Sequence, residues 1–120
     1  MIADYVGYVD AIFEEVTAIA DPSEVLIRVQ DFYAFPTDAY TDETAEIVYQ
    51  YWREGQDYVE VVAGRYGIPV AQVYDEFMGP DGTDNPEEKG LIGSDHIHPT
   101  KEGAQRMAEM IHDLGYGLAS

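Results

Sequence analysis

Apolar residues recur at steps of three and four in three segments of the chain, which is the spacing of one helix face. The first segment covers residues 2–20 and is followed by a Pro22 that cannot continue it. The second covers residues 41–66. The third covers residues 101–114 and is followed by Gly115, a residue typical of helix ends. The pattern therefore predicts three helices, each with an apolar face that another element must cover.

Two short runs rich in β-branched residues separate these helices. Residues 25–30 and residues 68–74 have the composition of mostly buried strands, and a polar loop over 78–93 precedes the last helix. Alternation of helix and strand predicts a single α/β domain over residues 1–120, with a parallel sheet and helices on both faces. Two strands make a poor parallel sheet, so both are expected to need neighbours that these residues do not supply.

The charge balance narrows the classes of partner. The chain has 6 Lys and Arg against 24 Asp and Glu, a formal net charge of −18. Such a chain repels nucleic acid and anionic membranes, and a solvated acidic surface, as in a salt-adapted protein, is the simplest interpretation. The absence of cysteine excludes disulfides and thiolate catalysis. No membrane-spanning stretch or signal peptide is visible, and the compartment stays open.

Residues 93–100 combine a carboxylate and an imidazole three positions apart. Asp95 precedes His98, and Pro99 and Thr100, a candidate helix cap, follow. A carboxylate at this spacing can hold the Nδ1–H of the ring and leave Nε2 free to accept a proton from a hydroxyl. The segment follows the second predicted strand, where ligands bind in open α/β sheets. On spacing alone, a capping aspartate beside an ordinary surface histidine is the alternative interpretation.

The residues around this pair read SDHIHPTKEG from position 94 to position 103. They resemble the last conserved block of the SGNH hydrolases, also called GDSL lipases and esterases, which reads Asp-x-x-His-Pro, then a glycine (here Gly103), then an apolar helix. The resemblance covers only the C-terminal half of the family's domain. It implies a three-layer α/β/α, flavodoxin-like sandwich with an incomplete sheet. It also implies that His98 is the general base and that Asp95 orients it during hydrolysis of a small carboxylic ester or acetylated substrate.

The same resemblance implies groups that this sequence lacks. In the family a Gly-Asp-Ser motif supplies the nucleophile, and a Gly and an Asn complete the oxyanion hole. The three serines, Ser23, Ser94 and Ser120, do not follow Gly-Asp, and the only Asn is Asn85, in the loop before the pair. We therefore expect this chain alone to be inactive as an esterase. Three explanations stay open. The chain is a fragment or truncated product of a larger hydrolase, it pairs with another chain that supplies the missing half, or it is a relative that has lost activity.

Other clusters allow other chemistry. His96 and His98 alternate beside Asp95, and His112 could add a third nitrogen ligand to a transition metal. The loop over residues 81–88 clusters four acids and could bind calcium, although a solvated acidic loop is simpler. No metal or cofactor is assigned. Among the ten tyrosines none is assigned a role, and residues 32–40 are the expected source of substrate contacts.

The second hypothesis comes from a different class, a non-catalytic assembly module. Its basis is the apolar two-strand sheet with missing neighbours. It predicts self-association that buries strand edges and the apolar face of the helix over residues 2–20. Either hypothesis leaves the chain needing a partner, which is a second copy or a missing N-terminal half.

Overall fold

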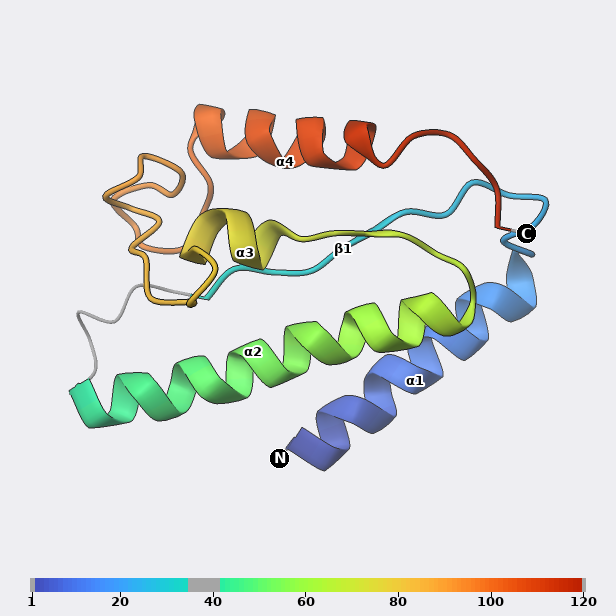
Figure 1. Cartoon of the computed structure of the whole chain (residues 1–120), viewed down its shortest axis with the longest axis horizontal. Coiled ribbons are helices and arrows are strands. Elements are labelled where there is room, and N and C mark those ends of the chain that lie inside the picture. Colours follow the sequence, from blue (N-terminus) through green and yellow to red (C-terminus); the bar gives the residue numbers. More distant parts are fainter. Residues whose placement is uncertain (1, 35–41, 120) are drawn as a thin grey trace.

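The computed structural model describes residues 2–34 and 42–119 and has mixed α/β structure, with 54% helix and a small parallel sheet of two strands (Figure 1). In chain order the elements are α1 (Ile2–Ile19), β1 (Val29–Gln30), α2 (Asp42–Arg65), β2 (Val70–Ala71), α3 (Val73–Met78) and α4 (Lys101–Asp113).

The three long helices lie where the periodicity predicted them. Thr100 is the N-cap of α4, because its hydroxyl accepts the N–H of Gly103 at 3.0 Å. Gly55 does not interrupt α2. It is buried, and a Cβ at this position would stand 3.1 Å from the Tyr5 ring, so the missing side chain lets α1 pack closely against α2.

The strands are shorter than the sequence predicted. Only two residues of each run pair, in the parallel register Val29 with Val70 and Gln30 with Ala71. The second run was predicted as a strand through position 74, and that prediction is wrong, because Val73 begins α3. A contact from far away in the sequence overrides the strand propensity here, as described for Asp31 below.

The core consists of two clusters of buried apolar side chains. In Figure 1, α4 lies on one side of the strands, and α1 and α2 lie on the other. The cluster against which α4 packs, together with Tyr49 and Trp52 of α2, consists of Tyr33, Ala34, Ala71, Val73, Tyr74, Phe77, Met78, Leu91 and Ile92. The α1 and α2 side is filled by Val9, Phe13, Val59, Val62, Ala63 and Ile68. Burial of these apolar side chains, more than the short ladder, holds the fold together.

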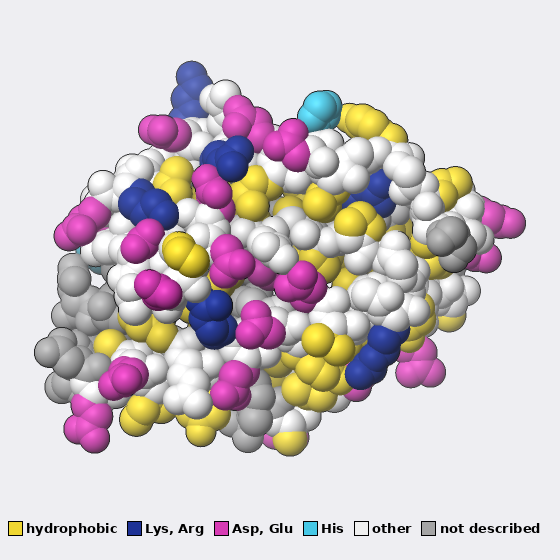
Figure 2. Space-filling view, in the orientation of Figure 1, with side chains coloured by type: hydrophobic (Ala, Val, Ile, Leu, Met, Phe, Trp, Pro, Cys, Tyr) yellow, Lys and Arg dark blue, Asp and Glu magenta, His cyan; other side chains and the backbone are white. Residues whose placement is uncertain are grey.

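Most of the described acidic residues lie on the surface. Figure 2 shows Asp and Glu side chains across the visible face, with Lys and Arg side chains among them. In the described part of the chain, no helix has the length and apolar character needed to cross a bilayer.

Asp31 is a buried carboxylate that joins β1 to α3. Its side chain accepts the N–H of Tyr74 at 2.8 Å, and its own N–H donates to the carbonyl of Ala71 at 3.1 Å. Because Gln72 gives α3 no side-chain cap, Asp31 satisfies an amide of the first turn from another element. Burial raises the pKa of Asp31 to about 6, against the opposing effect of the Tyr74 N–H.

Asp31 should make the stability of the fold depend on pH. The folded protein keeps this proton to a higher pH than the unfolded chain, so the free energy of unfolding falls as pH rises from about 4 to about 6. Asn does not ionise, so Asp31→Asn removes this fall in stability, and its side-chain oxygen still accepts the N–H of Tyr74. We expect the variant to be more stable than the parent at about pH 7, by at most about 3 kcal/mol, and not at about pH 4.

Urea denaturation followed by circular dichroism across this pH range measures the difference. Asp57→Asn, at an exposed position of α2, removes the same formal charge and should leave the pH dependence unchanged. Curves for the parent and Asp31→Asn that run parallel from about pH 4 to about pH 7 would contradict the assignment.

Candidate active site

A short hairpin before α4 positions the aspartate and histidine singled out in the sequence. Ile92 and Pro99 form an antiparallel bridge, and the N–H of Gly93 donates to the carbonyl of His98 at 2.9 Å. The N–H of Thr100 donates to the carbonyl of Leu91 at 3.0 Å. These backbone bonds join the two arms of the hairpin around residues 94–97, and the second arm leads directly into α4.

Asp95 and His98 are in contact across this turn. The Nδ1 of His98 lies 2.6 Å from Oδ2 of Asp95, while Oδ1 accepts the backbone N–H groups of Ile97 and His98, each at 3.0 Å. The His98 side chain is 79% exposed, and no described residue bonds its Nε2. The carboxylate thus holds Nδ1 of the imidazole and leaves Nε2 open to an incoming proton donor.

The environment of Asp95 keeps it ionised. The N–H of Ile97, the His98 ring and the N–H of His98 together lower the pKa of the Asp95 carboxyl to about 2. The carboxylate is therefore a permanent negative charge at neutral pH. Its two oxygens hold the Nδ1 of the His98 ring and the backbone amides of the turn at the same time.

Tyr33 anchors the turn that carries Asp95 and His98. Its ring is almost fully buried and stacks against Phe77, with ring centroids 4.8 Å apart. Its hydroxyl donates to the carbonyl of Ile97 at 2.6 Å. Burial, and then the charge of Asp95, raise the pKa of the Tyr33 hydroxyl, which keeps it a proton donor to that carbonyl. Tyr33 lies in the segment expected to supply substrate contacts, but it holds the turn; residues 35–40 of that segment lie outside the described residues.

Gly103 lets α4 start directly behind the hairpin. A Cβ at this buried position would overlap the carbonyl oxygen of Leu91. The same backbone stretch carries the bond from Thr100 to Leu91, so α4 and the hairpin meet backbone to backbone. The glycine quoted for the family resemblance thus has a steric reason in this chain.

A second imidazole–carboxylate pair lies beside the first. The Nδ1 of His96 lies 2.5 Å from Oε2 of Glu87, which comes from the loop before the hairpin. His96 has a φ of 65°, a left-handed conformation that costs energy for a residue with a side chain. No sequence pattern indicated this pair, because its partners are nine positions apart in an irregular loop.

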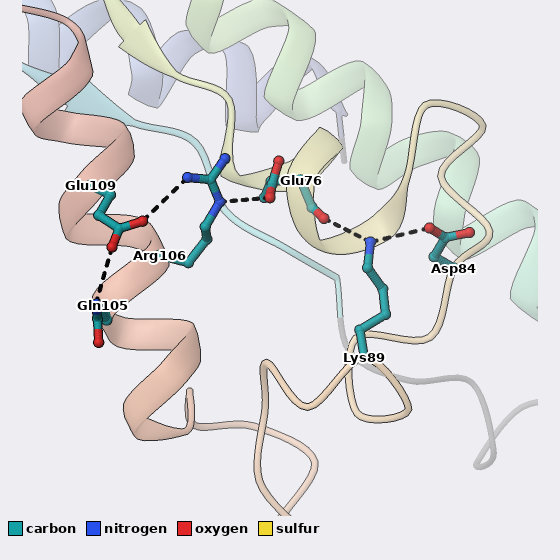
Figure 3. Close-up of polar contacts among 6 residues, drawn as sticks. All are labelled: Glu76, Asp84, Lys89, Gln105, Arg106 and Glu109. Carbon is teal, nitrogen blue, oxygen red and sulfur yellow. Dashed lines mark hydrogen bonds and ion pairs between the residues drawn. The ribbon is translucent and has the colours of Figure 1, made fainter.

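Ion pairs brace the loop and α4 against α3 (Figure 3). Arg106 on α4 donates through Nε to Glu76 on α3 at 2.6 Å, and Lys89 in the loop donates to the carbonyl of Glu76 at 2.8 Å and to Asp84 at 3.2 Å. Arg106 lowers the pKa of the Glu76 carboxyl through this hydrogen bond. All four side chains are partly exposed, so these bonds align the elements more than they stabilise the fold.

The other candidate residues do not join the pair. The hydroxyl of Ser23 donates to Asp21 at 2.7 Å, and the side chain of Asn85 accepts the N–H of Glu87 at 2.9 Å. Ser120 lies outside the described residues. Two shallow depressions lie along α1 and α4, and neither is lined by Asp95 or His98.

The arrangement gives the metal hypotheses no geometric support. Among residues 2–34 and 42–119, no three His, Asp or Glu side chains gather as they would around a metal ion. His112 lies on α4 beside Asp113, at 3.7 Å. In the acidic loop, Asp84 and Glu87 instead contact Lys89 and His96.

Searches against family models, curated proteins and solved structures found no match to this chain.

Gly103→Ala should destabilise the protein. The added Cβ meets backbone, which cannot rotate away, so α4 must shift from the hairpin, at a cost of about 1–3 kcal/mol in the free energy of unfolding. Gly64→Ala is the matched control, because nothing lies within 4 Å of a Cβ there. Gly64 lies in the last turn of α2, so this control should leave the stability unchanged or raise it by less than about 1 kcal/mol. Equal midpoints in urea for the two variants would contradict the steric role of Gly103.

Asp95→Asn should change the protonation pattern of the His98 ring. With the carboxylate present, the neutral ring keeps its proton on Nδ1. The amide oxygen of Asn cannot serve both the turn amides and Nδ1–H as the two carboxylate oxygens do, so the share of the Nδ1–H form falls. Long-range ¹H–¹⁵N spectra of the histidine rings report this directly. Glu87→Gln is the control, since it should alter His96 and leave His98 unchanged.

Proposed function

We propose that this chain carries the histidine–aspartate half of the active site of an SGNH-type serine ester hydrolase, acting on small carboxylic esters or acetyl groups. One observation carries the proposal: Nδ1 of His98 is held by Asp95 at 2.6 Å while Nε2 faces solvent. That is the geometry a general base needs, and it occurs within the sequence block that resembles the family.

In this proposal His98 moves one proton in each half of the reaction. Its Nε2 accepts the proton of a serine hydroxyl as the serine oxygen bonds to the ester carbonyl carbon. The resulting imidazolium returns that proton to the departing alcohol as the ester C–O bond breaks. Water then repeats the cycle on the acyl-enzyme, with His98 again as the base. Asp95 stays ionised throughout and orients the ring.

The nucleophile must come from outside this chain. Ser23 donates to Asp21, Ser94 adjoins the acid of the pair, and neither follows Gly-Asp. No Gly-Asp-Ser motif is present, and Asn85 is engaged in its own loop. The proposal therefore includes a partner or a longer polypeptide that supplies the serine and the oxyanion donors.

The proposed fold is the flavodoxin-like three-layer sandwich of that family, of which this chain forms one part. Support comes from the parallel pairing of β1 and β2 and from the helices on both sides of them. The site also lies beyond the carboxyl ends of the strands, since the segment after β1 reaches it through Tyr33.

Activity measurements with a complete site test the proposal. The DNA upstream of Met1 is read for an in-frame Gly-Asp-Ser block, and the corresponding longer protein is assayed with p-nitrophenyl acetate. We expect His98→Ala to lower kcat by a factor of about 10⁴, because the base is lost, and Asp95→Asn to have a similar effect. His96→Ala and His112→Ala are matched controls and should retain most activity.

The present chain supplies the complementary result. Purified residues 1–120 should not hydrolyse p-nitrophenyl acetate above the rate seen with His98→Ala. Hydrolysis by this chain that depends on His98 would overturn the claim that the half-site is incompetent alone. A longer protein whose activity survives His98→Ala would overturn the assignment of the base.

A further inference from the structure

One edge of β1 has no partner. In the parallel ladder the N–H groups of Val29 and Asp31 donate to Pro69 and Ala71 of the β2 segment. Backbone groups alternate in direction along a strand, so the N–H and C=O of Gln30 face away from β2. Within the described residues no group bonds them, and Gln30 is exposed.

The residues on the N-terminal side of β1 also lack a strand partner, although the N–H of Val25 donates to Asp21 in a turn. Residues 25–30 have the composition of a complete strand, but only the last two pair with β2. Val25 and Leu26 are 45% and 42% exposed, although such side chains are usually buried in a sheet. A neighbour at this edge would cover these two side chains.

The free edge of β1 ends at Phe32, whose backbone groups bond to α2. The N–H of Phe32 donates to Oε1 of Gln56 at 2.7 Å, and Nε1 of Trp52 donates to the carbonyl of Phe32 at 3.0 Å. Both partners come from α2, so α2 occupies the position of a neighbouring strand at Phe32 and leaves it free at Gln30. An incoming strand therefore has a defined end point.

We propose that β1 of a second copy of this chain pairs with this edge, antiparallel and about a two-fold axis, to form a continuous four-stranded sheet. The N–H and C=O groups of Arg28 would pair with those of Gln30 in the other copy, and the reverse. A strand edge is complementary to itself in this arrangement. Four strands also exceed the minimum that a stable sheet needs, which two strands do not reach.

The local charge at this edge suits a second copy. Residues 25–30 contain no acid, in a chain with 24 of them. The one charged side chain, Arg28, is turned toward the C-terminal segment, where its guanidinium donates to the carbonyls of Gly115 and Gly117. Two copies can therefore meet here without opposing carboxylates on the strands themselves.

The total charge opposes the same contact. Each copy carries a formal charge of −18, so the two molecules repel at long range. The Debye length falls from about 10 Å to about 3 Å as salt rises from about 0.1 M to about 1 M. Association at the edge should therefore strengthen with salt, opposite to an interface held by ion pairs. This inference concerns the chain by itself, because in the proposed sandwich strands from outside this chain would compete for the same edge.

A competing surface exists on α1. Tyr8, Ile12, Val16 and Ile19 form an exposed apolar stripe, distinct from the face of Val9 and Phe13 that packs on α2. Nothing in the structure says what covers this stripe. It enters the experiment as the alternative interface.

Sedimentation velocity and hydrogen exchange on the intact chain test the inference. We expect a monomer–dimer equilibrium that shifts to dimer between about 0.1 M and about 1 M salt. The amide of Gln30 should exchange more slowly as protein concentration rises, while the amide of Val29 stays protected at every concentration because it donates to β2. Gln30→Pro removes one edge donor per copy and should raise the dimer dissociation constant about tenfold or more.

Gln30→Ala is the matched control, because it keeps the N–H and should leave the dissociation constant nearly unchanged. Protection of the Val29 amide in Gln30→Pro shows whether β1 and β2 still pair. If that variant does not fold, the concentration dependence of the Gln30 amide in the unmodified chain decides alone. A monomer at every salt concentration overturns the proposal. So does a dimer that leaves the Gln30 amide fast and is lost in Ile12→Glu, since α1 is then the interface.

Discussion

The Tyr33 ring connects the sheet, α3 and the candidate site. It is 1% exposed and stacks between Phe32 and Phe77, at centroid distances of 4.6 Å and 4.8 Å. Its hydroxyl reaches the carbonyl of Ile97, inside the turn that carries Asp95 and His98. A ladder of two residues per strand cannot by itself align the elements that follow it. Aromatic packing at the end of β1 aligns them instead, and the orientation of the turn that carries Asp95 and His98 depends on this packing.

The features that were predictable from the sequence are those set by neighbours along the chain. The apolar steps of α1, α2 and α4 gave their positions, and Thr100 and Gly115 marked the ends of α4 correctly. The pair of Asp95 and His98 is predictable for the same reason. Three positions separate them, so a single turn fixes their distance whatever the remainder of the fold does.

The features that were missed depend on distant contacts. Residues 73 and 74 read as strand, yet Asp31, more than forty positions earlier, holds the first turn of α3. The strand over 25–30 has the right composition, but a strand also needs a partner along its length, and no sequence pattern reports whether one is present. The roles of Tyr33 and of Glu87 were missed because each acts through a loop whose path no periodicity describes.

The hairpin that carries Asp95 and His98 is held by contacts between residues close in sequence, and this bears on the order of folding. Its bonds join residues between Leu91 and Thr100, so closing it costs little chain entropy, whereas β1 must find β2 across the whole of α2. Low contact order favours early formation. The hairpin can therefore form during folding before the sheet does, and the acid–base pair is then a local unit onto which the longer-range structure assembles.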